Sequence, residues 1–456
     1  MITFDPSEKL HRLVKQALDS GAAQSLAEAE ALFQGYCLAL IIDQTEATNP
    51  LSQAALLTAV ALGRRVFLGG VMVEGTLDVP LTVPMPLGAT LREAVIALGG
   101  AVASAADGTP TIVIGGGARL RRPGFCVRTA VGGWRGGILP IHSELAPEPG
   151  PEMPLAAMLA AALAINEAFL FVNGGVPVAG HRPIGVSLWR PEAQADWLTG
   201  DSNEPQLAYL PSRLWLIGLG HLGQAYLWGL GLLPYADPGD VSLVMQDVDV
   251  ITPSTESTSI LTDASILGVK KTRAMAAWAE RRGFTAVIHE RLFDSGFTRQ
   301  ADEPTVALCG LDNALGRRAL DLVGFDLVVE AGLGRGHRDF RTIRLHVLPS
   351  PRPAAEIWKV GKRDDKVEDR AAYAKMFEDG QLDRCGVTLL AGKAVGAPFV
   401  GAVAATLALA EVLRLLHGGA LHQLIDLDLL SVEHRLASPH PFDFSRLNPG
   451  YGLAVT

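Results

Sequence analysis

The sequence predicts an α/β fold built as two tandem halves, each with a mostly parallel, doubly wound sheet. Three observations support this prediction. Short apolar runs typical of buried strands alternate with apolar helical stretches. One strand leads into a glycine-rich turn, and landmarks of one half recur in the same order in the other. The chain has 456 residues, of which 48% are hydrophobic and 19% charged, enough for two or three domains with sizeable cores.

An internal repeat divides the chain. Residues 154–175 align without a gap with residues 398–419, with eight identities that include Glu167 with Glu411. Two Ala-rich helices could match by chance, but other landmarks repeat in the same order, which makes duplication credible. These paired landmarks are residues 38–43 with 214–219, 111–116 with 305–310, and 124–125 with 324–325.

The two halves differ where chemistry is expected. The first half has Asp43-Gln-Thr-Glu46 where the second has its glycine-rich turn, and Ala118-Arg119 where the second has Asp312-Asn313. We therefore predict an inactive first half and an active second half. The predicted boundaries are a helical preface at 6–32, the preface and inactive half together at 1–200, a polar linker at 192–211, and the active half at 205–456.

Within the second half, apolar periodicity and turn residues predict the elements in order. The predicted strands are 213–218, 241–247, 285–289, 305–309, 326–330 and 341–348, with final strands around 424–434. The predicted helices are 221–233, 268–282, 313–323 and 396–417. The stretch 398–416 is apolar enough to raise the question of a membrane span, but it carries Glu411 and Arg414, which favours a buried helix.

Composition excludes several classes of function. The net charge is −9 and no long basic run offsets it, which argues against a nucleic-acid partner. The four cysteines form no CxxC pair and the eleven histidines form no HxH or HExxH spacing, so we assign no zinc site and no disulfide framework. The N-terminal residues lack a basic segment followed by an apolar core, so we expect no signal peptide, and we expect a cytoplasmic protein without a membrane partner.

Four short stretches in the second half carry residues suited to a nucleotide. Gly218, Gly220 and Gly223 follow a strand and open a helix, an arrangement that lets backbone N–H groups approach a polyphosphate. The glycines alone are compatible with NAD, FAD or ATP. The other stretches add acids and a lysine at the same sheet edge, which suits ATP and Mg²⁺ better than a nicotinamide. Their residues are Asp247, Asp249, Lys271, Asp312 and Asn313.

Each of these residues could instead have a purely structural role. Lys271 could be a solvated lysine, but a cation at a helix N-terminus is unfavourable without an anion nearby. Asp247 and Asp249 alternate along a strand, so we expect them on opposite faces, with Asp247 reaching the ligand. Asp312-Asn313 could be a helix N-cap. Their place after a strand at the ligand edge favours metal positioning by Asp312.

This set of motifs resembles the ThiF/MoeB/ubiquitin-activating-enzyme (E1-like) superfamily, whose members adenylate the C-terminal glycine of a ubiquitin-fold protein. The resemblance covers about half the chain and implies that the three glycines cradle ATP. It also implies that Asp247 binds the ribose, Lys271 the phosphates and Asp312 the Mg²⁺. The run Glu330-Ala-Gly-Leu-Gly-Arg-Gly336 resembles a motif of ubiquitin-activating enzymes. An inactive half fused to an active half matches their layout, and closest of all the activating enzymes of bacterial ubiquitin-like conjugation operons, which act in antiphage defence.

The resemblance also implies a second chemical step and a second cation. Cys385 precedes a V-G-x-x-x-G helix start, Val395 to Gly401, where family members place the cysteine that takes the acyl group as a thioester. The crossover segment is predicted at 351–395, and its basic residues favour a thiolate. Arg12 is a candidate for the arginine that such proteins insert from an N-terminal helix into the opposite active site, where it compensates the charge of pyrophosphate. Cys37, Cys126 and Cys309 are predicted to be core residues.

The sequence departs from the family pattern at one motif. The family has an Asn and an Arg after the strand that ends in D-x-D, whereas this chain has Ser254-Thr-Glu-Ser-Thr258. Two hydroxyls and nearby Arg273 are candidates to replace them. The paired zinc-binding CxxC motifs of MoeB and ThiF are also absent.

The predicted function is an ATP- and Mg²⁺-dependent activating enzyme, monomeric or homodimeric. Its partners would be the C-terminal tail of a ubiquitin-like or sulfur-carrier protein and a conjugating enzyme. Three alternatives remain open: a sulfur-carrier adenylyltransferase, a non-catalytic module that binds a ubiquitin-like protein, and an NAD(P)-dependent oxidoreductase. The last explains neither Lys271 nor Asp312-Asn313.

Overall fold

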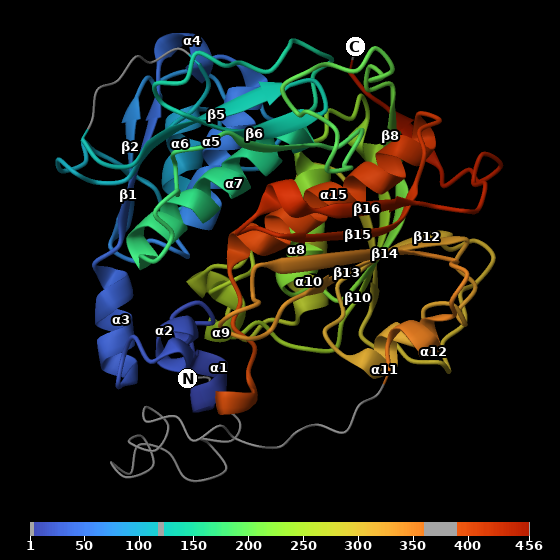
Figure 1. Cartoon of the computed structure of the whole chain (residues 1–456). Coiled ribbons are helices and arrows are strands. Elements are labelled where there is room, and N and C mark those ends of the chain that lie inside the picture. The colour runs from blue at the N-terminus through green and yellow to red at the C-terminus, as the bar shows by residue number, and fades with distance from the viewer. Residues whose placement is uncertain (1–3, 117–122, 360–389, 456) are drawn as a thin grey trace.

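The computed structural model describes residues 4–116, 123–359 and 390–455. Its strands form two large sheets and one small one (Figure 1). The seven-stranded sheet contains β1 (Cys37–Ile42), β2 (Gly70–Gly75), β3 (Ala101–Val102), β4 (Thr111–Val113), β5 (Cys126–Gly132), β6 (Arg135–Pro140) and β7 (Ile184–Ser187). The eight-stranded sheet contains β9 (Arg213–Ile217), β10 (Ser242–Gln246), β11 (Thr285–His289), β12 (Val306–Cys309), β13 (Leu327–Leu333), β14 (Thr342–Leu348), β15 (His422–Asp428) and β16 (Leu436–Pro439). Strands β8 (Tyr209–Pro211) and β17 (Tyr451–Leu453) form an antiparallel pair.

The two large sheets share one topology. Their strand orders are β3-β2-β1-β4-β5-β6-β7 and β11-β10-β9-β12-β13-β14-β15-β16, which are the same order counted from β1 and from β9. In each sheet the first five strands pair in parallel and the later ones antiparallel. This confirms the predicted fold class, two tandem Rossmann-like halves with mostly parallel sheets. We call the parts that carry these sheets the first half and the second half.

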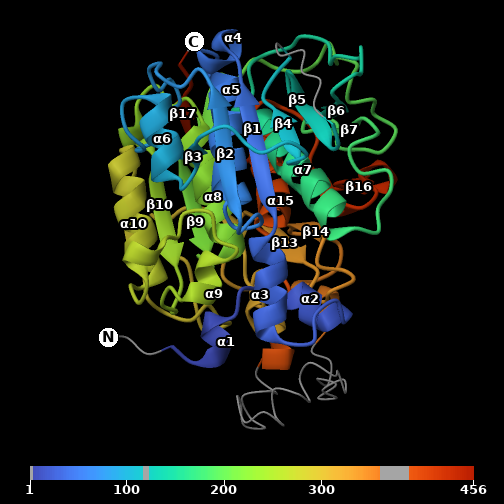
Figure 2. The ribbon, with the colours of Figure 1, turned by 90° about the vertical axis from the view of Figure 1, so that its left-hand side faces the viewer.

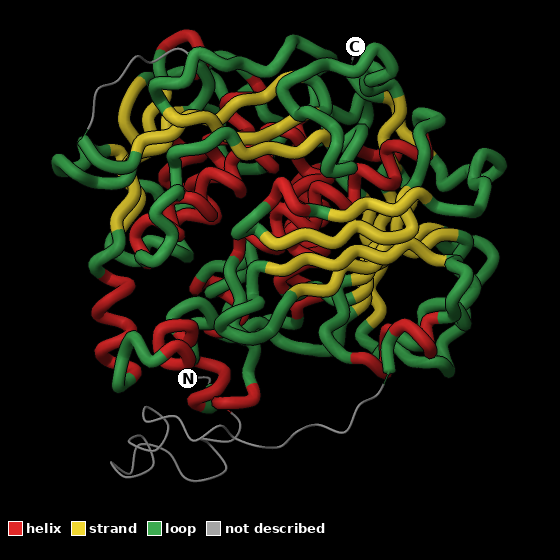
Figure 3. Tube along the Cα trace, viewed as in Figure 1, coloured by secondary structure: helices red, strands yellow, loops and turns green. Residues whose placement is uncertain are grey.

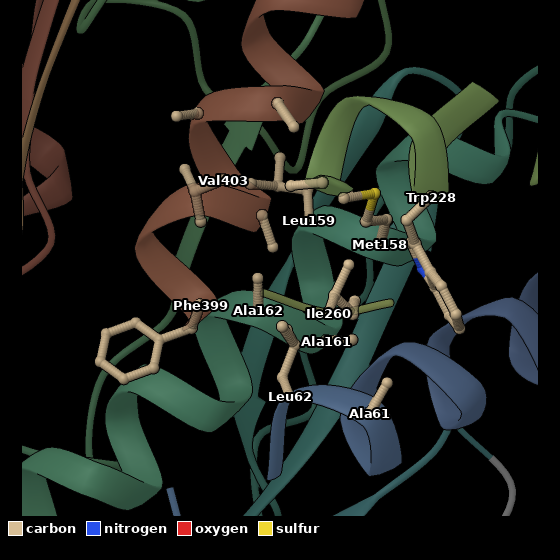
Figure 4. Close-up of a cluster of buried hydrophobic side chains, with 14 of the residues drawn as sticks. Ala61, Leu62, Met158, Leu159, Ala161, Ala162, Trp228, Ile260, Phe399 and Val403 are labelled. Atoms are coloured by element: carbon tan, nitrogen blue, oxygen red, sulfur yellow. The ribbon is translucent and has the colours of Figure 1, made fainter. Parts of the chain in front are cut away.

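Four apolar helices lie between the two sheets (Figure 3). The first half contributes α5 (Pro50–Gly63) and α7 (Pro154–Asn173), and the second half contributes α8 (His221–Leu232) and α15 (Pro398–Leu416). Their contact is a dry layer in which Leu62, Leu159, Trp228 and Val403 are fully buried (Figure 4). The core of each half is therefore completed by the other half.

Helices α7 and α15 are long and apolar enough to cross a membrane by length and composition alone. In this structure 89% of the apolar window of each is buried inside the protein. Helix α15 packs against α7, α8 and β13. Packing between two sheets accounts for their apolar sequences, as predicted for 398–416.

Most predicted elements of the second half are present, and three differ. The predicted helix 268–282 begins only at Lys271, as α10 (Lys271–Arg282), because Gly268 has a φ of +83° and Lys270 bridges to Val250. The predicted helix 313–323 is wrong in length: α11 spans Ala314–Arg317, and turns carry Leu320 and Val323 into the core. The final strands are β15 and β16, and a 3₁₀ turn, η3 (Val432–His434), occupies much of the range between them.

The predicted helical preface is three short helices at one end of the molecule. They are α1 (Pro6–Lys9), α2 (Lys15–Ser20) and α3 (Leu26–Gln34), and α1 lies against α9 (Pro253–Glu256) of the second half (Figure 2). Asp5 caps α1 by accepting from the backbone of Ser7 and Glu8. The preface therefore reaches the second half before the chain enters the first.

The other helices within the described residues are short. They are α4 (Gln44–Ala47), α6 (Leu91–Ala97), α12 (Ala354–Ile357) and the 3₁₀ turns η1 (Pro238–Asp240) and η2 (Ala264–Ile266). On the outer face of the second sheet, Trp215 and Cys309 pack with Phe297 and Leu320. Both faces of the central strands are thus buried, as a parallel sheet requires.

A buried polar cluster joins the halves far from the glycine turn. His422 lies between two carboxylates, with Nδ1 3.2 Å from Glu411 and Nε2 3.2 Å from Glu192. Glu411 also pairs with the Arg414 guanidinium, which donates to the Leu188 carbonyl. Burial lowers the pKa of His422, but its bonds to Glu192 and Glu411 outweigh burial, so the pKa is raised.

Candidate active site

The glycine turn after β9 is shaped to receive a ligand. Gly218 has a φ of +81°, which a side chain would strain. A Cβ at Gly223 would lie 2.0 Å from the Gly218 carbonyl oxygen, so this glycine lets α8 pack on the turn. A Cβ at Gly220 would meet only the Lys271 Nζ, at 3.9 Å, so the side of the turn at the start of α8 is open. A helix N-terminus with open space before it attracts anions.

Asp247, Asp249 and Lys271 come together beside this turn. The Lys271 Nζ lies 2.8 Å from Asp249 Oδ2 and 3.7 Å from Asp247 Oδ2. Asp247 accepts hydrogen bonds from the backbone N–H of Leu219 (2.7 Å) and of Asp249 (2.8 Å). The carboxylates thus balance a cation placed at the first residue of α10.

The expectation that Asp247 and Asp249 face opposite ways is wrong. Strand β10 ends at Gln246, so both acids lie in the following loop, where strand alternation no longer holds. The Asp247 side chain is 9% exposed and holds the turn through backbone N–H groups, whereas Asp249 is 65% exposed. Asp249 is therefore the more accessible of the two to a bound molecule.

The loop after β12 brings Asp312 to the same edge of the sheet. The Gly310 carbonyl lies 3.1 Å from the position of a Cβ at Gly218, so the loop adjoins the glycine turn. Asp312 is exposed, and its backbone carbonyl accepts from Arg335 at 3.4 Å. The Asn313 side chain caps α11 by accepting from Gly316 at 2.6 Å, so its oxygen is used in the fold. Asp312 therefore contributes an exposed carboxylate at this edge, whereas the Asn313 side chain is used as a helix cap.

Arg12 reaches this site from the N-terminal preface. Its Nε donates to Ser254 Oγ at 2.5 Å and its backbone N–H to Ser257 Oγ at 3.0 Å. Burial lowers its pKa, the charge of nearby Asp312 raises it, and nearby Arg335 lowers it. An arginine stays protonated under these shifts, so Arg12 and Arg335 bring two positive charges close to Asp312.

The motif that departs from the family therefore has a role in this structure. Ser254 and Ser257, which stand in the region where an Asn and an Arg were expected, hold Arg12 in place. Arg273 does not take that role, because its side chain pairs with Glu290 at 2.7 Å on the exposed side of α10. The guanidinium that this motif holds, that of Arg12, therefore comes from the preface, whereas Arg273 of α10 points elsewhere.

The matching junction in the first half is filled by its own side chain. Glu46, after β1, accepts from the Gly116 N–H at 2.9 Å and from Ser52 Oγ at 2.5 Å. A Cβ at Gly115 would lie 2.1 Å from the Glu46 Cδ. A carboxylate thus occupies the junction of the turns after β1 and β4, and the inactivity of the first half stays a prediction.

The described residues fit ATP better than a self-contained metal site. Within residues 4–116, 123–359 and 390–455, no group of three His, Cys, Asp or Glu side chains could hold a metal ion. One exposed carboxylate, Asp312, suits Mg²⁺ that is bound largely by phosphates and water. The open turn at Gly220 and the Lys271 ammonium fit the phosphates themselves.

The cysteine predictions divide. Cys385, its neighbouring basic residues and most of the predicted crossover segment lie outside the described residues. Cys126 and Cys309 are buried, and burial raises the pKa of the Cys309 thiol to about 12, so it is a core residue. Cys37 is partly buried in β1.

Three residues at the site were missed by sequence reasoning. Arg335 lies in the run 330–336, whose resemblance to a family motif assigns it no role. Gln224, fully buried in α8, donates to the Leu219 carbonyl of the glycine turn at 3.2 Å. Arg317 donates to the Leu311 carbonyl at 2.9 Å and pairs with buried Glu330 at 2.8 Å. The available signal in the sequence was a polar residue within an apolar stretch, Gln224 in one case and Glu330 in the other, because a buried polar group needs a hydrogen-bond partner.

The comparisons with known proteins agree with the duplicated fold. Models of the BilD N-terminal domain and the BilD C-terminal domain match residues 37–188 and 210–419. The chain is 45% identical over 419 residues to the bacterial E1-like protein BilD of Collimonas sp. (strain OK412), covering 91% of this chain and 90% of that protein.

Solved structures give a weaker likeness. E. coli MccB with AMPCPP and SeMeT MccA matches with 14% identity and a TM-score of 0.34, over 51% of this chain and 64% of that chain. E. coli MccB with ATP matches with 14% identity and a TM-score of 0.32, over 50% and 64%. The matches span less than two thirds of the MccB chain, and at these TM-scores they support no conclusion about this chain.

Proposed function

This chain belongs to the BilD family of bacterial E1-like proteins, and from this premise we propose that it is an ATP-dependent activating enzyme. It would adenylate the C-terminal carboxylate of a ubiquitin-like protein and pass the acyl group to Cys385 as a thioester, for transfer to a conjugating enzyme. The observation that carries the proposal is the convergence of Lys271, Arg12 and Arg335 around the open glycine turn and Asp312.

The proposed reaction needs little covalent help from the protein. The carboxylate oxygen attacks the α-phosphorus of ATP, the bond to the pyrophosphate oxygen breaks, and pyrophosphate leaves with the added negative charge. Lys271 would bind the phosphates, and Arg12 would stabilise the charge that builds on the leaving group. Both cations are already held by carboxylates or hydroxyls, so little reorganisation is needed when ATP binds.

Magnesium and the ribose have candidate ligands at the same edge. Asp312 would hold Mg²⁺, which supplies positive charge to the phosphates when bound. Asp249, the more exposed acid, and Asp247 are the candidates for the ribose hydroxyls. Asp247 also fixes the turn itself, since it accepts the Leu219 N–H.

In the second proposed step, the Cys385 thiolate attacks the acyl carbon of the adenylate. A thioester bond forms, the bond to the phosphate oxygen breaks, and AMP leaves. A sulfur-carrier protein would share the adenylation step and differ in the group that then attacks the adenylate. We also propose that this enzyme is cytoplasmic, that it acts in bacterial antiphage defence, and that its partners are a ubiquitin-like protein and a conjugating enzyme.

Two measurements test the function. Thermal unfolding is compared with Mg²⁺-ATP and with NAD, because a ligand at 100 times its dissociation constant stabilises the fold by about 2.7 kcal/mol. ATP–pyrophosphate exchange is then measured with a panel of ubiquitin-like and sulfur-carrier proteins. The control is the same proteins with an amidated C-terminus, which cannot attack.

Each outcome has one meaning. Stabilisation by ATP, with exchange that needs a free C-terminal carboxylate, supports the proposal. Stabilisation by NAD alone would indicate an oxidoreductase. Partner binding without exchange would indicate a non-catalytic module.

A further inference from the structure

A buried arginine of the first half holds a loop of the second half. Arg65, just after α5, is 4% exposed and donates to the Ala61 carbonyl of its own helix. It also donates to three carbonyls of the second half, those of Glu256 (2.9 Å), Ile260 (3.1 Å) and Thr262 (2.5 Å). Arg64 adds a bond to the Thr262 carbonyl at 2.8 Å. The loop 256–262 is therefore fixed by the half that has no nucleotide turn.

This loop adjoins one side of the candidate site through Arg12. It continues from α9, and Ser254 in that helix and Ser257 in the loop accept from Arg12. The preface lies close to Arg65 as well. Burial lowers the pKa of His11, the charge of nearby Arg65 lowers it further, and together they bring it to about 4. The position of Arg12 thus depends on where the loop is held.

The same loop adjoins the glycine turn through Gln224. The Gln224 Oε1 accepts from the Leu261 N–H and from Thr262 Oγ1, both at 3.0 Å. Its Nε2 donates to the Leu219 carbonyl. Within this loop, the Ile260 side chain lies among the apolar side chains of the helix layer (Figure 4). The loop connects Arg65 with both the cation and the turn.

Arginine suits this position because its planar guanidinium offers several donors at fixed angles. Three carbonyls from one loop converge on it. Without the guanidinium, the carbonyls of Glu256 and Ile260 would lose this buried donor, and the Thr262 carbonyl would keep only its bond from Arg64. A loop that loses these bonds has other conformations available, and Arg12 and the turn would follow it.

We propose that Arg65 is a positioning residue of the active site, through which the first half sets the place of Arg12 and of the glycine turn. The inactive half then has a role in catalysis although its own junction is closed by Glu46. This inference rests on the proposed function for its catalytic consequence but not for the contact network.

The catalytic test is a double-mutant cycle in ATP–pyrophosphate exchange. We expect Arg65→Met to lower kcat about tenfold in the wild-type background and by a clearly smaller factor in the Arg12→Ala background, because the part of the effect that passes through Arg12 is then absent and only the part that passes through the glycine turn remains. Arg435→Met is the matched control: Arg435 is 6% exposed and donates to the carbonyls of Pro191, Val432 and Glu192, far along the chain from the site. It should leave kcat unchanged. If Arg65→Met does not fold, Arg65→Lys carries the same comparison.

The structural test needs no activity. Hydrogen exchange is measured by mass spectrometry on peptides covering 252–262, and we expect faster exchange there in Arg65→Met than in Arg435→Met. Equal exchange in the two variants, or a full effect of Arg65→Met in the Arg12→Ala background, would overturn the inference. If the wild type neither binds ATP nor exchanges pyrophosphate, the proposed function fails, while the hydrogen-exchange result still decides whether Arg65 holds the loop.

Discussion

Replacing Lys271 by Met is the most direct probe of the candidate site. The Lys271 side chain is 12% exposed, and its ammonium lies beside the open face of the glycine turn. Two unit charges about 4 Å apart interact by about 1 kcal/mol in water and about 4 kcal/mol at an effective dielectric of 20. Loss of one phosphate contact by Lys271 should therefore weaken Mg²⁺-ATP binding by roughly 5- to 1,000-fold. The unbalanced charge of Asp249 would add repulsion of the ligand.

The assay is isothermal titration calorimetry with Mg²⁺-ATP, supported by thermal unfolding without ligand to show that the variant folds. Lys270→Met is the matched control, since Lys270 is the adjacent lysine and its Nζ donates to the Val248 carbonyl instead of facing the acids. It should bind ATP as the wild type does. Binding by Lys271→Met within about twofold of the wild type, or an equal loss in Lys270→Met, would show that Lys271 does not contact the phosphates.

Three further predictions concern the glycine turn, the candidate metal ligand and the buried histidine. Gly223→Ala should lower the melting temperature, because its Cβ would lie 2.0 Å from a backbone oxygen and overpacking costs about 1–3 kcal/mol. Gly220→Ala should instead weaken ATP binding and leave the melting temperature nearly unchanged. Equal melting temperatures of the two variants would contradict this. Asp312→Asn should raise the Mg²⁺ concentration needed for half-maximal exchange about tenfold at unchanged stability, and an unchanged Mg²⁺ dependence would exclude it as the metal ligand. The pKa of His422 is raised from 6.5, so the stabilisation by its charged form is complete below pH 6.5 and is lost as the pH rises through the pKa of the folded state. Above pH 6.5, the free energy of unfolding should therefore fall less steeply in His422→Gln than in the wild type. Denaturant titrations at several pH values measure this, and parallel pH profiles would refute it.

The local features of this chain could be predicted from its sequence. Apolar periodicity and turn residues are local signals, and they predict the strand β9, the glycine turn after it and the start of α10 near Lys271. The duplication was visible for the same reason, since repeated strands and helices repeat their apolar patterns. The length of α11 was not predictable, because Leu320 and Val323 reach the core through turns as well as they would on a helix.

The completed site was decided by contacts between distant segments. Arg12 bonds to Ser254, 242 positions away, and Arg65 bonds to Thr262, 197 positions away, so no local pattern records either pairing. Asp247 and Asp249 share Lys271 because the strand ends before them, a boundary that an alternating pattern does not mark. The sequence by itself determined which half carries the glycine turn. Only the packing of the two halves around four shared helices decided which cations reach it, because the position of each cation depends on hydrogen bonds that exist only after both halves have folded together.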